Sequence, residues 1–333
     1  MRAMVLESQK AVEQSPLSLR DVPLPTPGPG QIRVRVSCCG VCHTDLHIVE
    51  GDLPLHKKPV VPGHQVVGIV DAVGSGTSAF KEGERAGIVW LHSTDGTCPY
   101  CRSGRENLCE NARFTGYDVD GGYAEAVLVP EDFAYKLPQG FSDENVAPLL
   151  CAGVIGYRAF RLTGVQRGQR LGLYGFGASA HIVQQVARHL GCEIHVFTRT
   201  QAHRDLASRL GASFVGDARD AQANSLDAAI MFAPAGPLVP ESLRALRKGG
   251  TVALAGITMT PIPQMDYGLI YHERVLRSVA NSTRQDAREL LEIAADIPVK
   301  TSVTMFSLEQ ANEAIAAMKH SKVEGAAVLR VKG

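Results

Sequence analysis

The stretch RLGLYGFGASAHIVQQVARHLGC, residues 170–192, decides how the second half of the chain is expected to fold. It runs from an apolar strand through the loop Gly175-Phe176-Gly177-Ala178-Ser179-Ala180 into a helix. In a G-x-G-x-x-A loop, the first glycine allows a tight turn, the second lets the backbone approach a pyrophosphate, and the small third residue lets helix and strand pack closely. Gly175, Gly177, Ala178 and Ala180 are therefore candidate dinucleotide-binding residues; a tight turn that binds nothing is the alternative.

The residues after this loop alternate between apolar strands and helices. In the first helix, apolar residues recur at helical spacing and form one face, at Ile182, Val183, Val186 and Leu190. Strand-like IHVFTR, DAAIMFAP and TVALAGI then alternate with helix-like AHRDLASRLGA and ESLRALRKGG between residues 194 and 257. Strands that alternate with helices of this length predict an α/β fold with a doubly wound parallel sheet.

The first 150 residues have a different pattern. QIRVRVS at residues 31–37 alternates apolar and polar residues, and QVVGIVDAVGSG and GGYAEAVLVP are further strand-like runs. Turns roughly every ten residues between short strands predict a barrel-like, β-rich domain. Near the C-terminus a helix, a strand and a second helix follow, and Ser307 with Gln310 forms a capping box for the last helix.

A second informative stretch is CGVCHTDLHIVEGDLPLHKKPVVPGHQVVG, residues 39–68. It places Cys42 on a short loop and His64 on a Pro-Gly turn about twenty residues later, as an open zinc site requires, because a catalytic zinc takes three protein ligands and keeps a fourth position free. A buried cysteine and a satisfied core histidine are the alternative.

Composition and charge exclude several classes of protein. Hydrophobic residues make up 45% of the chain and charged residues 20%, as in ordinary globular proteins. Lys plus Arg equals Asp plus Glu at 34 each, so no electrostatic footprint for nucleic acid or an anionic membrane is present. No secretory leader or membrane-length apolar run is visible, so we expect a cytoplasmic protein. In that compartment the clustering of the eight cysteines indicates metal binding rather than disulfides.

Three motifs in fixed order resemble the zinc-dependent medium-chain alcohol dehydrogenases. They are CGVCHTDLH followed by VPGH, the lobe DGTCPYCRSGRENLC at residues 95–109, and PLLCAGVIGYRAF at residues 148–160. The resemblance covers essentially the whole chain. It implies a GroES-like catalytic domain at residues 1–150, a Rossmann domain at 151–284, and a return to the catalytic domain at 285–333.

The resemblance also implies the site residues. Cys42, His64 and Cys151 match the catalytic zinc ligands. The structural zinc lobe of the family normally has four cysteines, whereas this chain offers Asp95, Cys98, Cys101 and Cys109. Because a carboxylate is an acceptable zinc ligand, we expect a second zinc there, with an empty lobe as the alternative.

Further positions match the groups that surround the catalytic zinc in this family. Asp45 matches the carboxylate that orients the ligating histidine, and Thr44 with His47 matches the proton relay. His43 matches a contact to the cofactor phosphate. Trp90 and Leu91 match the wall of the alcohol pocket. The implied reaction is hydride transfer between a primary or small alcohol and a nicotinamide cofactor.

The cofactor choice is inferred from the end of the second Rossmann strand. An acidic residue there favours NAD, whereas an arginine accommodates the 2′-phosphate of NADP. This chain has Thr198 and Arg199, with no carboxylate before Asp205. We therefore expect a preference for NADP(H), with NAD(H) as the alternative.

The chain departs from the family at several positions. Gln65 replaces a glutamate beside the zinc ligand, Ile155 replaces a threonine near the nicotinamide, and Gly325-Ala326 lacks an arginine that some relatives use on the pyrophosphate. Arg284 is a candidate substitute for that arginine. The alternative functions are a zinc-free quinone or enoyl reductase of the same superfamily and a non-catalytic zinc-binding protein. Relatives of this length suggest a homo-oligomer, a dimer or a tetramer.

Overall fold

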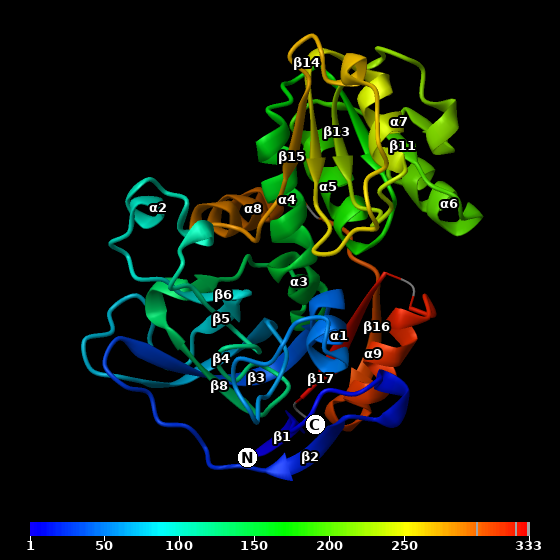
Figure 1. Cartoon of the computed structure of the whole chain (residues 1–333). Coiled ribbons are helices and arrows are strands. Elements are labelled where there is room, and N and C mark those ends of the chain that lie inside the picture. Colours follow the sequence, from blue (N-terminus) through cyan, green and yellow to red (C-terminus); the bar gives the residue numbers. More distant parts are fainter. Residues whose placement is uncertain (298, 324, 332–333) are drawn as a thin grey trace. The chain divides into compact units, whose positions relative to one another are not determined.

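The computed structural model describes residues 1–297, 299–323 and 325–331 of the chain (Figure 1). These residues form two compact units. The first unit consists of Met1–Cys151, Thr283–Ala295 and Lys300–Gly333, and the second of Ala152–Ser282 and Asp296–Val299. The chain therefore leaves the first unit after Cys151 and returns to it for its C-terminal part.

The first unit is built on a seven-stranded sheet in the order β16-β17-β3-β4-β5-β9, in which β8 also pairs with β3. A separate antiparallel pair, β1-β2, and the short pair β6-β7 complete its strands. The strands are β1 (Arg2–Leu6), β2 (Leu17–Asp21), β3 (Gln31–Val41), β4 (Gln65–Val73), β5 (Arg85–Ile88), β6 (Leu91–Ser93), β7 (Arg113–Phe114), β8 (Ala126–Pro130), β9 (Ala134–Lys136), β16 (Val303–Ser307) and β17 (Ala326–Arg330).

Strand β3 shows why this sheet forms. Its alternating sequence buries Ile32, Val34 and Val36 in the core and leaves Arg35 exposed on the other face. On the side away from β4, β3 pairs with β17 in the antiparallel direction, and Leu329 lies opposite Cys39. The C-terminal strands therefore extend the sheet that the N-terminal strands begin.

Short helices connect and cover the strands of the first unit. Ser307 and Gln310 form the expected capping box, which opens η7 just before α9. The α-helices are α1 (His43–Glu50), α2 (Pro99–Arg102), α3 (Asp143–Val146), α8 (Arg284–Asp296) and α9 (Ala311–Lys319). The 3-10 helices are η1 (Val12–Gln14), η2 (Glu106–Leu108), η3 (Glu131–Phe133), η4 (Ala147–Leu150) and η7 (Leu308–Gln310).

The second unit is a six-stranded, wholly parallel sheet in the order β12-β11-β10-β13-β14-β15. Its strands are β10 (Arg170–Tyr174), β11 (Glu193–Phe197), β12 (Phe214–Gly216), β13 (Leu226–Met231), β14 (Leu246–Leu254) and β15 (Val275–Ser278). The order reverses at β10, the first strand, and this reversal defines a doubly wound fold whose ligand site lies at the carboxyl ends of the strands. The predicted parallel sheet is confirmed.

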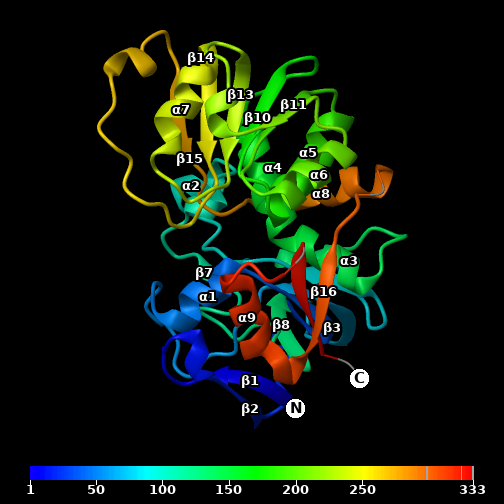
Figure 2. The ribbon, with the colours of Figure 1, turned by 90° about the vertical axis from the view of Figure 1, so that its right-hand side faces the viewer.

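Helices cover both faces of this sheet (Figure 2). Helices α4 and α5 pack against each other, and α4 lies on β13 and β14. Helix α7 also contacts β13 and β14. The helices and 3-10 turns of this unit are α4 (Ala152–Thr163), α5 (Ala178–His189), α6 (Gln201–Arg209), α7 (Leu238–Ala245), η5 (Ala218–Asp220) and η6 (Tyr267–Leu269).

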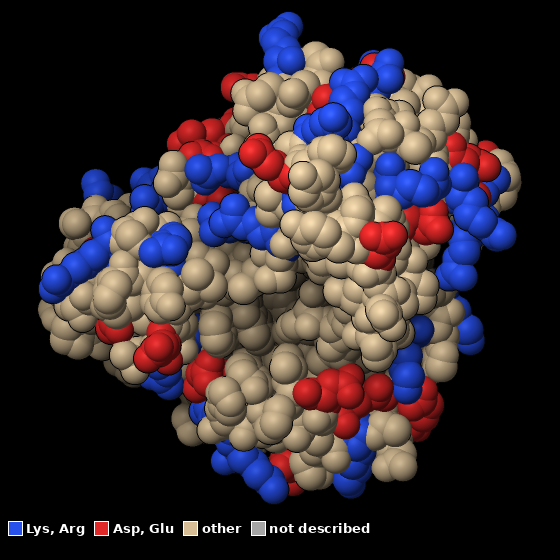
Figure 3. All heavy atoms as spheres, turned by 45° about the horizontal axis from the view of Figure 1, so that its top comes forward, with Lys and Arg blue, Asp and Glu red and all other residues tan. Residues whose placement is uncertain are grey.

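Lys and Arg side chains are interspersed with Asp and Glu side chains on the face that Figure 3 draws, in keeping with the balanced charge of the sequence. Among the described residues, no single helix is long and apolar enough to span a membrane. The bent pair Asp143–Leu150 and Ala152–Thr163 reaches that length and apolarity only when the two helices are taken together.

Candidate active site

The beginning of α1 places the first candidate zinc ligand. Cys42 is the N-cap residue, and its Sγ accepts a hydrogen bond from the Thr44 backbone N–H at 3.5 Å. In return, Asp45 Oδ2 accepts from the Cys42 backbone N–H at 2.9 Å, which completes a reciprocal cap. The sequence Cys-His-Thr-Asp therefore fixes both the thiol and the carboxylate at one helix end.

The second candidate ligand, His64, lies on the turn before β4. Gly63 has φ +97°, and a Cβ at this position would collide with the Tyr123 ring, so only glycine fits here. His64 is fully buried, and its Nδ1 lies 3.2 Å from Asp45 Oδ1. This approach has ion-pair distance but not the angle of a hydrogen bond. Asp45 thus faces the side of the imidazole that points away from the thiols.

The third candidate ligand, Cys151, follows η4 at the end of the first unit. Its Sγ lies 3.5 Å from Cys42 Sγ, and the ligand atoms of Cys42, His64 and Cys151 all lie within 4.8 Å of one another. His64 Nε2 is buried and has no hydrogen-bond partner among the described residues. Two thiols and one unpartnered imidazole nitrogen are the donors of an open zinc site, so these residues fit the metal.

The ionisation of these groups is strongly coupled. The contact between the two sulfurs lowers the pKa of Cys42 and raises the pKa of Cys151. Burial opposes protonation of His64, but the Asp45 charge raises the pKa of His64 to about 10. A zinc ion binds thiolates and neutral imidazole and so must displace these protons, which makes its binding dependent on pH.

The expected relay residues lie on the same helix as Cys42. Thr44 Oγ1 lies 3.7 Å from Cys42 Sγ. His47 Nδ1 lies 2.7 Å from Asp52 Oδ2, and the histidine side chain is 14% exposed. Sequence reasoning missed Asp52, which follows α1 in an ordinary Gly-Asp turn and carries no motif. His43, the first residue of α1, is exposed.

Trp90 lies against the candidate zinc site, whereas Leu91 does not. The Trp90 ring meets the His64 ring edge-on, with centroids 4.9 Å apart, and stacks on Phe114 at 5.1 Å. Leu91 is fully buried in the core of the first unit and pairs β6 with β7. The side chain of Leu91 is enclosed by the core, and its place in the wall of the alcohol pocket stays a prediction.

The cysteine lobe forms a second cluster in the first unit. The ligand atoms of Asp95, Cys98, Cys101 and Cys109 lie within 4.8 Å of one another. Asp95 Oδ1 accepts from the Cys98 backbone N–H at 2.9 Å, and Asn111 Nδ2 donates to Asp95 Oδ2 at 3.0 Å.

The hydrogen bond from the Asn111 amide is the largest cause that holds the pKa of Asp95 far below its usual range, and the backbone N–H groups add to it. Three thiols and an ionised carboxylate fit a closed, tetrahedral zinc site. Asn111 was not found from the sequence, because nothing in the spacing of the lobe points to it.

In the second unit, the glycine-rich loop joins β10 to α5. Gly175 has φ +88°, and a Cβ here would lie 2.9 Å from the Ala233 backbone nitrogen, so glycine is required. Gly177 caps α5 and has open space where a side chain would stand, whereas Ala180 is buried. The turn therefore leaves the N-terminus of α5 accessible to a pyrophosphate, at the carboxyl end of β10.

The residues that follow β11 are the expected cofactor selectors. Thr198 is buried and Arg199 is exposed, and no hydrogen bond or ion pair holds the Arg199 guanidinium among the described residues. Arg204 on α6 donates from Nε to the Thr198 carbonyl at 3.0 Å, so a second guanidinium lies at this strand end. Asp205 is bound by the Gln201 amide at 2.7 Å.

Arg284, the candidate for a contact to the cofactor pyrophosphate, has partners in the first unit. It lies in the first unit at the start of α8, where its Nε lies 3.3 Å from Glu106 Oε1. Its guanidinium also lies 4.7 Å from the centre of the Phe133 ring. This guanidinium has partners within the first unit, and its role at the cofactor stays a prediction.

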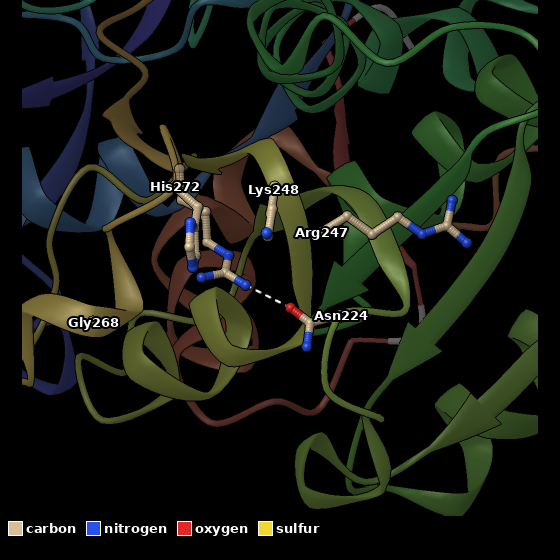
Figure 4. A pocket seen from close by; sticks show the side chains of 6 residues that line it. Asn224, Arg247, Lys248, Gly268 and His272 are labelled. Atoms are coloured by element: carbon tan, nitrogen blue, oxygen red, sulfur yellow. Dashed lines mark hydrogen bonds between the residues drawn. The ribbon is translucent and has the colours of Figure 1, made fainter.

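The second unit also has a basic cavity of about 480 Å³, whose lining includes Lys248, His272 and Arg274 (Figure 4). Arg274 Nη2 donates to Asn224 Oδ1 at 2.6 Å. The cavity lies at Arg247, near the amino end of β14, whereas the glycine-rich turn lies at the carboxyl end of β10 in the same parallel sheet. It is therefore separate from the dinucleotide turn.

Comparison with known proteins gives the family. The family model described as the alcohol dehydrogenase GroES-like domain matches residues 28–139, and the one described as zinc-binding dehydrogenase matches residues 180–296. "Probable alcohol dehydrogenase AdhA" from Mycobacterium tuberculosis (strain CDC 1551 / Oshkosh) is 48% identical over 337 residues, which cover 99% of this chain and 97% of that protein. An alcohol dehydrogenase from Geobacillus stearothermophilus is 35% identical over 341 residues, covering 99% and 100% of the two chains.

A solved structure agrees with these matches. A protein from Sinorhizobium meliloti 1021, assigned as a zinc-binding dehydrogenase and solved with NADP, has a TM-score of 0.88 at 27% identity, and the match covers 99% of each chain. The fold and the site thus define a two-unit, zinc-type dehydrogenase. The chain belongs to the zinc-dependent alcohol dehydrogenases of the medium-chain dehydrogenase superfamily, as its sequence motifs predict.

Proposed function

We propose that the chain interconverts a small or primary alcohol and the corresponding aldehyde, with hydride transfer to or from a nicotinamide cofactor. The observation that carries this proposal is the convergence of Cys42, His64 and Cys151, with His64 Nε2 buried and unpartnered. These residues would hold the catalytic zinc. A zinc ion held there would act as a Lewis acid that lowers the pKa of an alcohol hydroxyl.

The other residues near this cluster have supporting roles in the proposal. Asp45 orients His64 through Nδ1, and Trp90 forms part of the wall beside the imidazole. When bound, the nicotinamide cofactor would accept the hydride of the alcohol. Thr44 would take up the hydroxyl proton and His47 would release it to solvent, while Asp52 fixes His47 through Nδ1.

For the cofactor, we propose NADP(H) rather than NAD(H). The exposed Arg199 has no acidic partner among the described residues, and Arg204 lies at the same strand end. Thr198 and these arginines would bind the 2′-phosphate, for which guanidinium is well suited. Gly175, Gly177, Ala178 and Ala180 would receive the pyrophosphate at α5, and the exposed His43 would contact a cofactor phosphate.

We assign a structural zinc to the lobe. The support is the closed arrangement of Asp95, Cys98, Cys101 and Cys109, in which Asp95 is held ionised by Asn111 and by backbone N–H groups. A closed tetrahedral site leaves no position for substrate, so this zinc would stabilise the lobe rather than take part in the reaction.

A homo-oligomer is also proposed, with the surface around β15 as its contact. Large apolar residues are exposed in this region: Ile257 is 53% exposed, Tyr267 69%, Tyr271 56% and Val275 44%. Strand β15 is the edge of the six-stranded sheet. An edge strand with unpaired backbone groups and exposed apolar side chains nearby is a template for pairing with a second copy. Free thiols at all eight cysteines favour a reducing compartment such as the cytoplasm.

A spectrophotometric screen of alcohols and aldehydes with NAD(H) and NADP(H), combined with metal analysis, tests the function. We expect zinc-dependent alcohol oxidation. Reduction of quinone or enoyl substrates by a zinc-free protein would support the zinc-free reductases instead. Zinc binding without turnover of any alcohol or aldehyde would support the non-catalytic alternative.

A further inference from the structure

Tyr123 connects the core of the first unit to the candidate zinc site, although no sequence motif identified it. Its side chain is fully buried, and its hydroxyl donates to Asp45 Oδ2 across 3.1 Å. It lies on the segment between β7 and β8, which carries none of the candidate zinc ligands. The hydrogen bond from Tyr123 to Asp45 therefore comes from a segment of the chain other than the two turns that carry Cys42 and His64.

Asp45 is enclosed by three hydrogen-bond donors and the His64 imidazole. The Cys42 backbone N–H and the Tyr123 hydroxyl face Oδ2 at 2.9 and 3.1 Å. The Gly63 backbone N–H and His64 Nδ1 face Oδ1 at 3.3 and 3.2 Å. A carboxylate has about four lone-pair positions, and three of them accept hydrogen bonds here while His64 Nδ1 approaches Oδ1 at ion-pair distance, so these contacts favour one orientation of the carboxylate. Loss of one of the two donors to Oδ2 would allow the Asp45 carboxylate to change its orientation more easily.

The backbone fixes where the Tyr123 hydroxyl points. The Tyr123 N–H donates to the Pro62 carbonyl at 3.0 Å, and the Met4 N–H donates to the Tyr123 carbonyl at 2.8 Å. The ring packs against Gly63, directly beside His64. Tyr123 is therefore attached to the same turn that carries the histidine. Burial and the nearby Asp45 charge raise the pKa of Tyr123 well above its usual value, so the hydroxyl stays a donor.

We propose that Tyr123 is a positioning residue for the catalytic zinc site. Its hydroxyl holds Asp45 in the orientation in which Oδ1 faces His64 Nδ1, and this leaves Nε2 directed toward Cys42 and Cys151. The inference rests on the zinc assignment proposed above. Groups that orient metal ligands in this way commonly change metal affinity by 10–100-fold when removed.

The test is Tyr123→Phe, which removes one oxygen and keeps the ring. Tyr135→Phe is the matched control, because Tyr135 is also buried in the first unit and its hydroxyl has no partner among the described residues. Zinc affinity is measured by metal analysis of protein equilibrated in chelator-buffered zinc. The zinc that Cys42→Ser still binds is subtracted, so that only the site containing Cys42 is counted. Absorption of the Co(II)-substituted protein reports ligand geometry. We expect Tyr123→Phe to weaken zinc binding about tenfold and to shift the cobalt spectrum, and Tyr135→Phe to change neither.

A double-mutant cycle with Asp45→Asn separates this role from a general packing effect. If Tyr123 acts through Asp45, Tyr123→Phe will have little further effect on zinc affinity in the Asp45→Asn background. Additive effects, or a Tyr123→Phe protein with the zinc affinity and cobalt spectrum of the parent, would overturn the inference. If Cys42→Ser keeps all the zinc of the parent, the zinc assignment itself fails, and that outcome is distinct from any result at Tyr123.

Discussion

His47 Nδ1 and Asp52 Oδ2 lie 2.7 Å apart at the end of α1, and this pair fixes which nitrogen of the histidine remains available. With Nδ1 facing the carboxylate, Nε2 is left to exchange a proton. The aspartate is 58% exposed and the histidine 14%, so the pair connects the interior of the site to solvent. A carboxylate that orients a catalytic histidine in this way is a recurrent arrangement in proton transfer.

We expect Asp52→Ala to lower kcat for alcohol oxidation by roughly two- to tenfold, within the range of a single proton-transfer group. The physical reason is the loss of the bond that holds His47 in one orientation. The measurement is steady-state kinetics with metal analysis in parallel. Zinc content should not change, because Asp52 contacts none of the candidate ligands. A parent-like kcat in Asp52→Ala would show that His47 needs no partner.

Cys151→Ser should abolish most activity, by more than about 100-fold, because a neutral hydroxyl is a poor zinc ligand beside a thiolate. Metal analysis should show the loss of the zinc bound at this cluster. Cys192→Ser is a suitable control, because Cys192 is a free, buried thiol of the second unit outside both clusters. Full activity and unchanged zinc in Cys151→Ser would contradict the ligand assignment.

Asp95→Ala should lower thermal stability more than turnover. Metal binding and local folding are coupled in such lobes, so losing a ligand should lower Tm by about 5 °C or more, given roughly 2–4 °C per kcal/mol in domains of this size. Differential scanning calorimetry and zinc content are the measurements. Asn111→Ala, which removes only the amide bond to Asp95, should give a smaller change of the same sign. Indistinguishable Tm and zinc content in Asp95→Ala would favour an empty lobe.

The sequence predicted those parts of the site that depend on local spacing. Cys42 and His64 lie on turns whose shape is set by their neighbours, Asp45 at the cap and Gly63 in the turn, so the motif carries the geometry with it. The parallel sheet was predicted from the alternation of strands and helices, which is likewise a local pattern of the sequence. Local pattern and tertiary structure agree at these positions.

The contacts that the sequence did not predict arise from residues brought together only by the fold. Asp52, Tyr123 and Asn111 each bind a site residue without belonging to a spaced motif. Leu91 was placed by resemblance, whereas Arg284 was a candidate substitute for the arginine that Gly325-Ala326 lacks, and both roles stay predictions. The contacts that the spacing did not predict are the β6–β7 pairing at Leu91 and the ion pair of Arg284 with Glu106.

Thr198→Asp should shift the cofactor preference from NADP(H) toward NAD(H). The carboxylate would repel a 2′-phosphate and accept from the ribose hydroxyls. A charge-assisted bond to phosphate contributes roughly 1.5–3 kcal/mol, equivalent to about one to two decades in kcat/KM. The measurement is the ratio of kcat/KM for the two cofactors in parent, Thr198→Asp and Arg199→Ala. A parent that already prefers NAD(H) tenfold would show that Arg199 does not contact the phosphate.

The stability of the first unit should depend on pH through His92, which is 6% exposed on β6. Burial, followed by the Arg113 charge, lowers the pKa of His92 from 6.5 to about 4. Between these pH values the unfolded chain binds a proton that the folded protein does not. Stability is therefore fully present above pH 6.5 and falls as pH decreases toward 4, by up to about 3 kcal/mol at 1.36 kcal/mol per pKa unit.

His92→Gln removes this titrating group, so its urea-unfolding free energy should fall less steeply over the same pH range than that of the parent. The difference between variant and parent cancels the contribution of the zinc ligands, which titrate in both proteins. His320→Gln is the control, because it removes an imidazole that is 47% exposed in the same unit. If parent and His92→Gln show the same slope, His92 is protonated in the folded protein and its burial does not set the acid limit.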